Sequence, residues 1–179
     1  MKKIIAFAGS DSKTSINKQL ATYTANLVEN VEVKVLDLND YELPLYGIDL
    51  EQEIGIPENA HTFLKTIQEA DGIVLSLAEH NGAYATVFKN IFDWMSRIDS
   101  KLWGNVPMLL MATSPGPRGG QTVLEVAKGR LPYMGGNIVG DYSLPSFNEN
   151  FVDGKIVNET LLEKLHVEVA KLQAAVNKA

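Results

Sequence analysis

The sequence predicts an α/β fold, in which a five-stranded parallel sheet has helices on both faces. Short apolar runs alternate five times with segments whose apolar residues recur at helical spacing. Runs that are apolar at nearly every position are typical of strands buried on both faces, as parallel strands are. A crossover between parallel strands needs a connection long enough for a helix, and the intervening segments supply it.

Composition limits the function of these 179 residues, for which we expect a single domain spanning residues 1–179. The chain has no cysteine, which excludes disulfides and thiolate metal sites, and we expect no metal. The net charge of −6 comes without a basic cluster, so we expect no nucleic-acid partner. No apolar run is long enough for a membrane span and no leader opens the chain, so we expect a cytoplasmic protein without a membrane partner.

The elements follow from the apolar pattern, taken in chain order. Strands are expected at residues 2–8, 31–38, 73–77, 106–112 and about 137–141. Helices are expected from 16 to 27, 57 to 70, 84 to 98, from the end of the loop at 120 to about 131, and from about 159 to 176. Two tracts, 39–57 and 142–154, show no periodicity. The first is either functional or a surface excursion over the sheet edge.

Right-handed crossovers leave few topologies for five such strands, and the flavodoxin-like order 2-1-3-4-5 suits them, as a three-layer α/β/α sandwich. In that fold a ligand binds beyond the carboxyl ends of the strands, between the first and third. Three loops rich in small and polar residues would meet there, at 9–17, 78–82 and 113–120.

The first of these loops has the features of a phosphate site. Ser15 stands where it can cap the following helix, whose free N–H groups and positive dipole end attract an anion. The same residue types are also ordinary turn and cap residues, so this loop alone leaves both interpretations open. The Walker A pattern and the Gly-x-Gly-x-x-Gly fingerprint are both absent.

Three motifs, in order at the expected strand ends, resemble those of the NAD(P)H-dependent FMN reductases, relatives of the chromate, quinone and azo-dye reductases with a flavodoxin-like fold. That family reads Gly-Ser-x-Arg-x-x-Ser-x-Asn in its first loop, Pro-Glu-Tyr-Asn-Gly in its second, and Ser-Pro-Gly then Gly-Gly in its third. Any one motif alone would be weak. The matching residues are Gly9, Ser10, Ser15, Asn17, Glu79, Asn81, Gly82, Ser114, Pro115, Gly116, Gly119 and Gly120.

The resemblance implies bound FMN, with NADPH or NADH as co-substrate. The first loop would bind the FMN phosphate, and the second and third would lie along the isoalloxazine ring, with glycines that let backbone approach it. The flavin would supply the chemistry, so no catalytic side chain is expected. The implied cofactor-binding residues are Ser10, Ser12, Lys13, Ser15, Ile16, Asn17, Ala78, Glu79, His80, Asn81, Gly82, Ser114, Gly116 and Gly119.

The chain departs from the family pattern at three positions. Ser12 replaces the arginine of the first loop, which leaves Lys13 as the only cation there. Ala78 replaces the proline of the second loop. His80 replaces its tyrosine, and this histidine is either a contact beside the ring or an uninvolved surface residue.

The activity implied is hydride transfer from the nicotinamide to FMN, then electron transfer to a small acceptor: a quinone, a flavin, an azo compound or a metal oxyanion. A non-enzymatic flavodoxin and a flavin-free structural or sensory module are the alternatives. The first loop lacks the Thr-Gly-x-Thr of flavodoxins, whereas the missing arginine leaves the second alternative open. We also expect a homodimer or a dimer of dimers, with Trp94 partly at the subunit contact.

Overall fold

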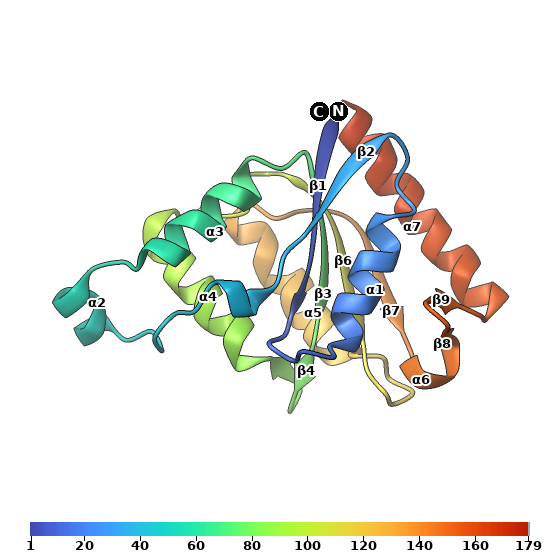
Figure 1. Ribbon diagram of the computed structural model, residues 1–179, viewed down its shortest axis with the longest axis horizontal. Coiled ribbons are helices and arrows are strands. Elements are labelled where there is room, and N and C mark those ends of the chain that lie inside the picture. The colour runs from blue at the N-terminus through green and yellow to red at the C-terminus, as the bar shows by residue number, and fades with distance from the viewer. Residues whose placement is uncertain (179) are drawn as a thin grey trace.

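Residues 1–178 are described by the computed structural model. Five parallel strands form one sheet in the order β2-β1-β3-β6-β7 (Figure 1). Because β6 and β7 are the fourth and fifth long strands along the chain, this is the expected flavodoxin-like order 2-1-3-4-5. The strands span β1 Lys2–Gly9, β2 Val31–Val35, β3 Gly72–Leu77, β6 Pro107–Thr113 and β7 Asn137–Leu144.

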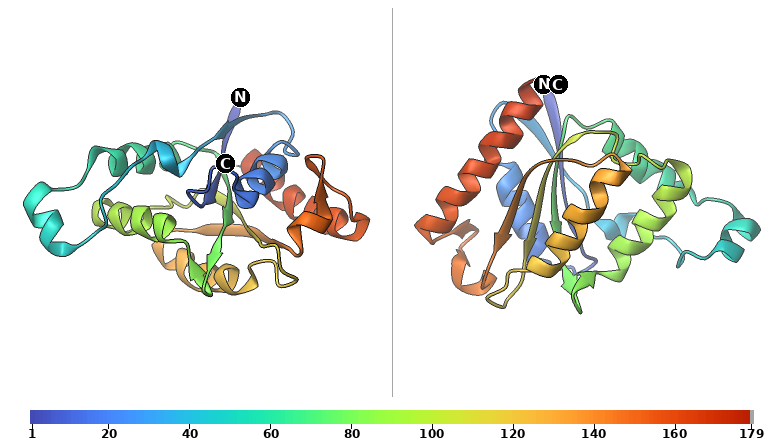
Figure 2. Two further views of the ribbon diagram at one scale, coloured as in Figure 1. Left: turned by 60° about the horizontal axis from the view of Figure 1, so that its bottom comes forward. Right: turned by 180° about the vertical axis from the view of Figure 1, so that it is seen from behind.

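Helices cover both faces of the sheet, which gives the expected three layers (Figures 1 and 2). On one face lie α1 (Ile16–Ala25) and α7 (Glu159–Lys178). On the other lie α3 (Glu58–Gln68), α4 (Thr86–Ile98) and α5 (Gln121–Arg130).

The two cores share β1, the second strand of the sheet, which lies between β2 and β3. Its side chains alternate between faces with a period of two, so Ile4 and Ala6 join the core under α1 and α7 while Ile5 and Phe7 join the other. All four are fully buried, as the apolar runs predicted.

Two strand ends differ from the expected ones. The second strand ends at Val35 instead of residue 38, because Asp37 begins a 3-10 turn, η1 (Leu38–Asp40), by accepting a hydrogen bond from Asn39 N. The last strand continues to Leu144 instead of stopping near 141, and the continuing residues Tyr142 and Leu144 are buried against the helices. A second 3-10 turn, η2 (Leu131–Met134), follows α5 directly.

Both tracts without periodicity contain regular structure. The first holds a short helix, α2 (Ile48–Ile54), which has no buried residue and projects from the body as an arm (Figures 1 and 2). The second holds α6 (Phe147–Asn150) and a hairpin of β8 (Phe151–Val152) and β9 (Lys155–Ile156). Such short elements leave little periodic signal in the sequence.

The loop expected at 78–82 is a small antiparallel hairpin of β4 (Glu79–His80) and β5 (Ala83–Tyr84). Its turn is Asn81-Gly82, where both residues have positive φ, 52° and 75°. Asn-Gly is the preferred pair for that turn, so the sequence carries a hairpin signal within the expected loop.

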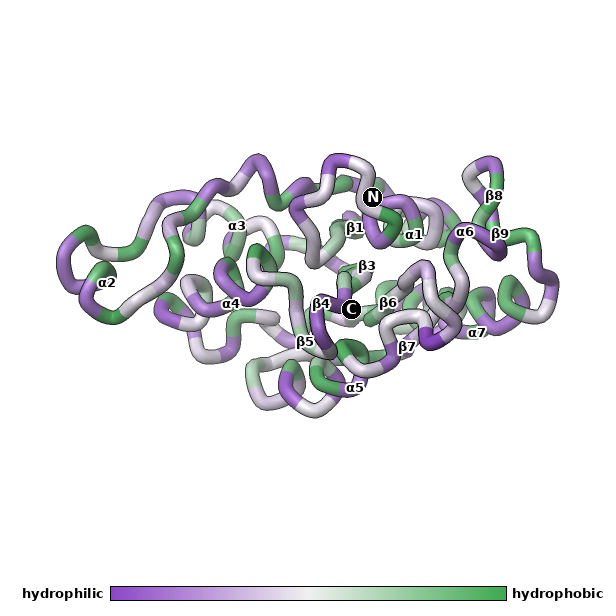
Figure 3. The backbone as a smooth tube through the Cα atoms, turned by 90° about the horizontal axis from the view of Figure 1, so that it is seen from below, coloured by the Kyte–Doolittle hydropathy of each residue, from purple (hydrophilic) through white to green (hydrophobic). Residues whose placement is uncertain are grey.

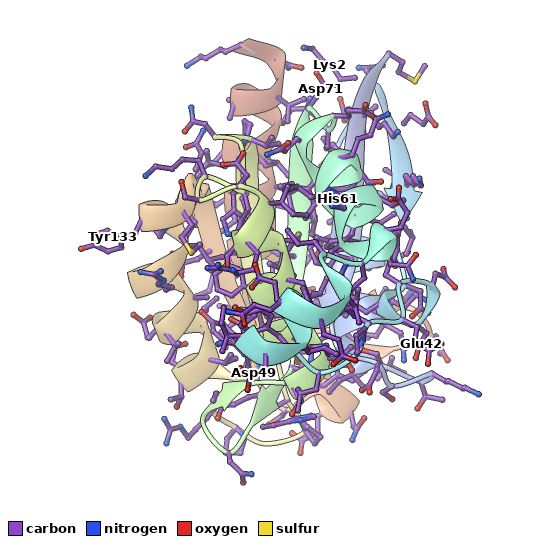
Figure 4. The ribbon with its side chains drawn as sticks, turned by 90° about the vertical axis from the view of Figure 1, so that its left-hand side faces the viewer. Lys2, Glu42, Asp49, His61, Asp71 and Tyr133 are labelled. Atoms are coloured by element: carbon purple, nitrogen blue, oxygen red, sulfur yellow. The ribbon has the colours of Figure 1, made fainter. Side chains whose placement is uncertain are left out.

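The amino ends of β1 and β3 are joined by polar contacts. Asp71, just before β3, accepts hydrogen bonds from Lys3 N at 2.7 Å and Lys2 Nζ at 3.0 Å, and Figure 4 shows Lys2 and Asp71 together at this end. Within residues 1–178, no helix is long and apolar enough to cross a membrane.

Candidate functional site

The three loops expected to meet do meet, at the carboxyl edge of the sheet that faces the viewer in Figure 3. They enclose a hollow of about 340 Å³, which we call the strand-end pocket. Its volume falls in the range of small-molecule sites. The pocket is lined by Ser10, Ser12, Thr14, Ser15, Ile16, Asn17, Ala78, Glu79, His80, Thr113, Ser114 and Pro115.

The first loop joins β1 to α1 and exposes the start of that helix. Ser15 caps it as expected, with Oγ accepting from Lys18 N at 3.1 Å and the backbone oxygen accepting from Gln19 N at 3.1 Å. The two preceding helical N–H groups, those of Ile16 and Asn17, have no intrahelical acceptor by the geometry of a helix start. Since both residues line the pocket, the positive end of α1 borders it, and an anion is favoured there.

Asn17 joins the start of α1 to the ends of β3 and β6. Its Oδ1 accepts from Ser76 Oγ at 2.7 Å and from Thr113 N at 3.0 Å, and its Nδ2 donates to Thr113 O at 3.2 Å. The three residues are buried. Most of the Asn17 amide is therefore engaged in holding α1 against β3 and β6, a role that the sequence did not indicate.

In the second loop, Glu79 turns its carboxylate toward α5. Its Oε2 accepts a hydrogen bond from Val123 N at 2.9 Å. Val123 is the third residue of α5, and the N-cap residue of this helix, Gly120, has no side chain that could accept that bond. The hairpin is thus fastened to α5 by a charge-assisted hydrogen bond. His80 is exposed at the rim of the pocket.

The third loop is held by hydrogen bonds from the segment that follows β7. Phe147 N donates to Ser114 O at 3.0 Å and Ser146 N donates to Gly116 O at 2.9 Å. Gly119 has φ 58°, and a Cβ there would lie 2.4 Å from Ser143 Oγ. The glycine is therefore required by packing against β7, in addition to any contact with a ligand.

Five of the implied residues do not line the strand-end pocket: Asn81, Gly82, Gly116, Gly119 and Lys13. Lys13 instead lines a second hollow beside α1. Three residues outside the implied cofactor-binding set, Thr14, Thr113 and Pro115, do line the pocket. Pro115 belongs to the third motif, and Thr14 and Thr113 are sequence neighbours of motif residues.

Polar and aromatic side chains on α4 have structural roles. Asn90 Oδ1 accepts from Tyr46 N at 2.8 Å, and Lys89 pairs with Asp93 at 2.6 Å. Trp94 is fully buried, and its Nε1 donates to Pro44 O at 2.8 Å. The expectation that Trp94 lies partly at a subunit contact is therefore wrong, because its whole side chain is covered within its own chain.

Lys18 is the second cation near the first loop. Its Nζ is hydrogen-bonded to Asp37, and this contact, together with the N–H of Asn39, holds the pKa of Asp37 below its ordinary value. Asp37 therefore stays ionised at neutral pH and balances much of the charge of Lys18.

The comparisons with known proteins bear on this site. The family model described as NADPH-dependent FMN reductase matches residues 2–149, which contain all three loops. The chain belongs to that family. Members of the NADPH-dependent FMN reductase family use FMN and NAD(P)H, and the protein is accordingly an oxidoreductase.

Individual relatives fit the same assignment. A 2-hydroxy-1,4-benzoquinone reductase of a Burkholderia species is 33% identical over 74% of this chain and 71% of its own length. A quinone reductase of Escherichia coli is 30% identical over 66% of this chain, but this match spans only 63% of that protein. The NAD(P)H:(acceptor) oxidoreductase FerB of Paracoccus denitrificans has a TM-score of 0.78 at 25% identity, covering 99% of this chain and 98% of that one.

The residues of the strand-end pocket fit FMN. A helix start with two orphan N–H groups and the hydroxyls of Ser10, Ser12 and Ser15 suits a phosphate. The opening beyond it is bordered by backbone of Ala78 and by Ser114, where a flat ring can lie against two loops. The first loop can therefore take the phosphate, and the part of the pocket between the second and third loops can take the ring.

Proposed function

We propose that this protein transfers hydride from NAD(P)H to FMN held in the strand-end pocket and passes the electrons to a small flat acceptor of the quinone class. The observation that supports this is the meeting of three strand-end loops around one hollow bordered by the start of α1. The quinone class is favoured because two relatives carry quinone reductase names.

The first loop and the start of α1 would bind the phosphate of FMN, through Ser10, Ser12, Ser15 and the N–H groups of Ile16 and Asn17. The second and third loops would orient the ring. When bound, FMN supplies the redox chemistry, since it accepts hydride and releases electrons to an acceptor.

No side chain of the pocket is required for proton transfer in this proposal. Glu79 is the acidic residue that lines the pocket, and its carboxylate is hydrogen-bonded to Val123 N. His80 is exposed, so it can contact an entering nicotinamide or acceptor without being essential. Orientation of two apposed rings is the main contribution the protein makes.

The chain would assemble with further copies of itself, as a homodimer or a dimer of dimers. The motivation is the arm around α2, where Leu45, Ile48 and Ile54 are 73%, 52% and 52% exposed. Exposed apolar side chains grouped in this way are typical of an interaction surface. The arm and α4 lie on the same side of the body, the side that faces the viewer in Figure 4, where Asp49 marks α2.

The test begins with the absorbance of the purified protein. A flavin spectrum excludes a flavin-free module, and bleaching by NADPH or NADH followed by reoxidation with a benzoquinone distinguishes a reductase from an electron carrier. Bound flavin that no nicotinamide reduces would overturn the proposal.

A matched pair of variants connects the activity to the pocket. Ser10→Asp puts a negative charge into the phosphate loop and should abolish FMN binding. Ser100→Asp adds the same charge near the amino end of β6, at the opposite edge of the sheet, and should leave binding unchanged. Equal FMN affinity in the two variants would place the flavin elsewhere.

A further inference from the structure

A groove larger than the strand-end pocket lies directly beside it. It occupies about 530 Å³ between one side of α1 and the hairpin β8–β9, which lie next to each other in Figures 1 and 3. We call it the α1 groove. It is lined by Lys13, Thr14, Ser15, Lys18, Gln19, Thr22, Tyr23, Asn26, Phe151 and Gly154.

The α1 groove is continuous with the phosphate end of the strand-end pocket, because Thr14 and Ser15 line both. Anything attached to a phosphate at the start of α1 would therefore extend into it. Lys13 and Lys18 stand at the same end. Lys18 is paired with Asp37, whereas Lys13 has no carboxylate partner within residues 1–178, so it is free to meet a second phosphate.

Beyond the lysines the groove offers an aromatic surface. The rings of Tyr23 and Phe151 meet edge to face, with centroids 5.5 Å apart. Phe151 is itself stacked on Phe147 at 4.8 Å, which holds this wall rigid. An aromatic side chain of this kind is a platform on which a nucleobase can stack.

Two amides complete the groove. Asn26 donates through Nδ2 to Thr22 O at 2.8 Å, which leaves its Oδ1 as an acceptor. Gln19 is exposed and its amide has no hydrogen-bond partner among residues 1–178. The groove therefore has cations at its phosphate end and, farther along α1, an aromatic ring flanked by two amides, which suits a phosphate followed by a base.

We propose that the chain binds FAD as well as FMN, with the adenosine monophosphate half of FAD in the α1 groove. The proposal rests on the proposed function, because the flavin half must occupy the strand-end pocket. The second phosphate would meet Lys13, and adenine would lie against Tyr23 with its edge toward Gln19 and Asn26.

Titration of the apoprotein, followed by quenching of flavin fluorescence, tests this. The wild-type protein should bind FAD at least as tightly as FMN. Thr22→Trp fills the groove, and we expect it to weaken FAD binding about tenfold or more while FMN stays within about twofold, since a stacked base contributes roughly that factor. Gln19→Glu should weaken FAD in the same selective way, because a carboxylate cannot donate a hydrogen bond to the adenine edge as the amide can, and Gln52→Glu on α2 is its control.

The outcomes separate the two proposals. If FMN binds but FAD binds more than about tenfold more weakly, the adenosine site is overturned and the proposed function stands. If neither flavin binds, both fail. If both bind and neither Thr22→Trp nor Gln19→Glu changes the ratio of their affinities, the adenosine half lies outside the groove. Binding of ADP to FMN-loaded protein that rejects FAD would assign the groove to a separate nucleotide and would also overturn the proposal.

Discussion

At the scale of single residues, Asn17 decides how the loops of the pocket are held. Replacing it with Ala would leave Thr113 N and Ser76 Oγ buried without a partner, and each such loss costs about 1–3 kcal/mol. We expect Asn17→Ala to lower the midpoint of urea unfolding clearly and to weaken FMN binding as a consequence. Lost FMN binding with an unchanged unfolding midpoint would instead mean that Asn17 contacts the phosphate directly.

Lys13 is the cation of the first loop, and it has no carboxylate partner within residues 1–178. A hydrogen bond to a charged group contributes about 1.5–3 kcal/mol against about 1 for a neutral pair, so we expect Lys13→Ala to weaken FMN binding about tenfold. Ser12→Arg should strengthen it by restoring the arginine of the family. Calorimetric titration at low salt measures both. An unchanged dissociation constant for Lys13→Ala would show that N–H groups and hydroxyls hold the phosphate.

At the scale of elements, Glu79 links the hairpin β4–β5 to the start of α5. Loss of a helix cap costs about 1 kcal/mol, so Glu79→Ala should destabilise the protein by about that amount. Glu79→Gln keeps an acceptor oxygen and should be close to the wild type in stability.

Stopped-flow measurement of flavin reduction should give both Glu79→Gln and His80→Gln rates within a few-fold of the wild type. A loss of several orders of magnitude would make either residue catalytic.

At the scale of the whole molecule, the arm around α2 should hold the subunits together. Ile48→Lys combined with Ile54→Lys places charge on its exposed apolar side chains, so sedimentation should show smaller particles than the wild type at the same micromolar concentration. Val167→Lys, on α7 across the sheet, alters a side chain of similar exposure and should change nothing. A wild-type monomer with flavin bound and full activity would refute the dimer.

The pairing around Asp71 contributes to the response of stability to acid. The N–H of Lys3 and the ammonium of Lys2 hold the pKa of Asp71 below its ordinary value of 3.8. A lowered pKa stabilises the folded state fully above that ordinary value, and the contribution is lost as the pH falls through the lowered one. We expect Asp71→Asn to have a lower free energy of unfolding than the wild type at pH 7. This difference in the free energy of unfolding should become smaller by pH 3. A constant difference, measured by urea unfolding, would contradict this.

Much of the fold could be predicted from the sequence, because long apolar runs and helical periodicity report burial directly. The strand order followed from that pattern and the right-handed crossover rule. The cap at Ser15 followed from local chemistry, since a helix needs an acceptor at its start wherever it lies. The convergence of the three loops followed as well, because parallel strands present their carboxyl ends at one edge.

Other features depended on contacts between distant residues. Asn17 is hydrogen-bonded to Ser76, which lies 59 residues away in the sequence, and to Thr113, which lies 96 residues away. Nothing in the local sequence specifies these contacts. The place of Trp94 depended on Pro44, and the short α2 is joined to α4 by the ion pair of Glu51 with Arg97. The sequence by itself determined which segments form the sheet and its pocket, because burial and capping are local demands. Only the tertiary structure decided which polar side chains brace the pocket and which remain free for a ligand, because a hydrogen-bond partner is chosen by position in space.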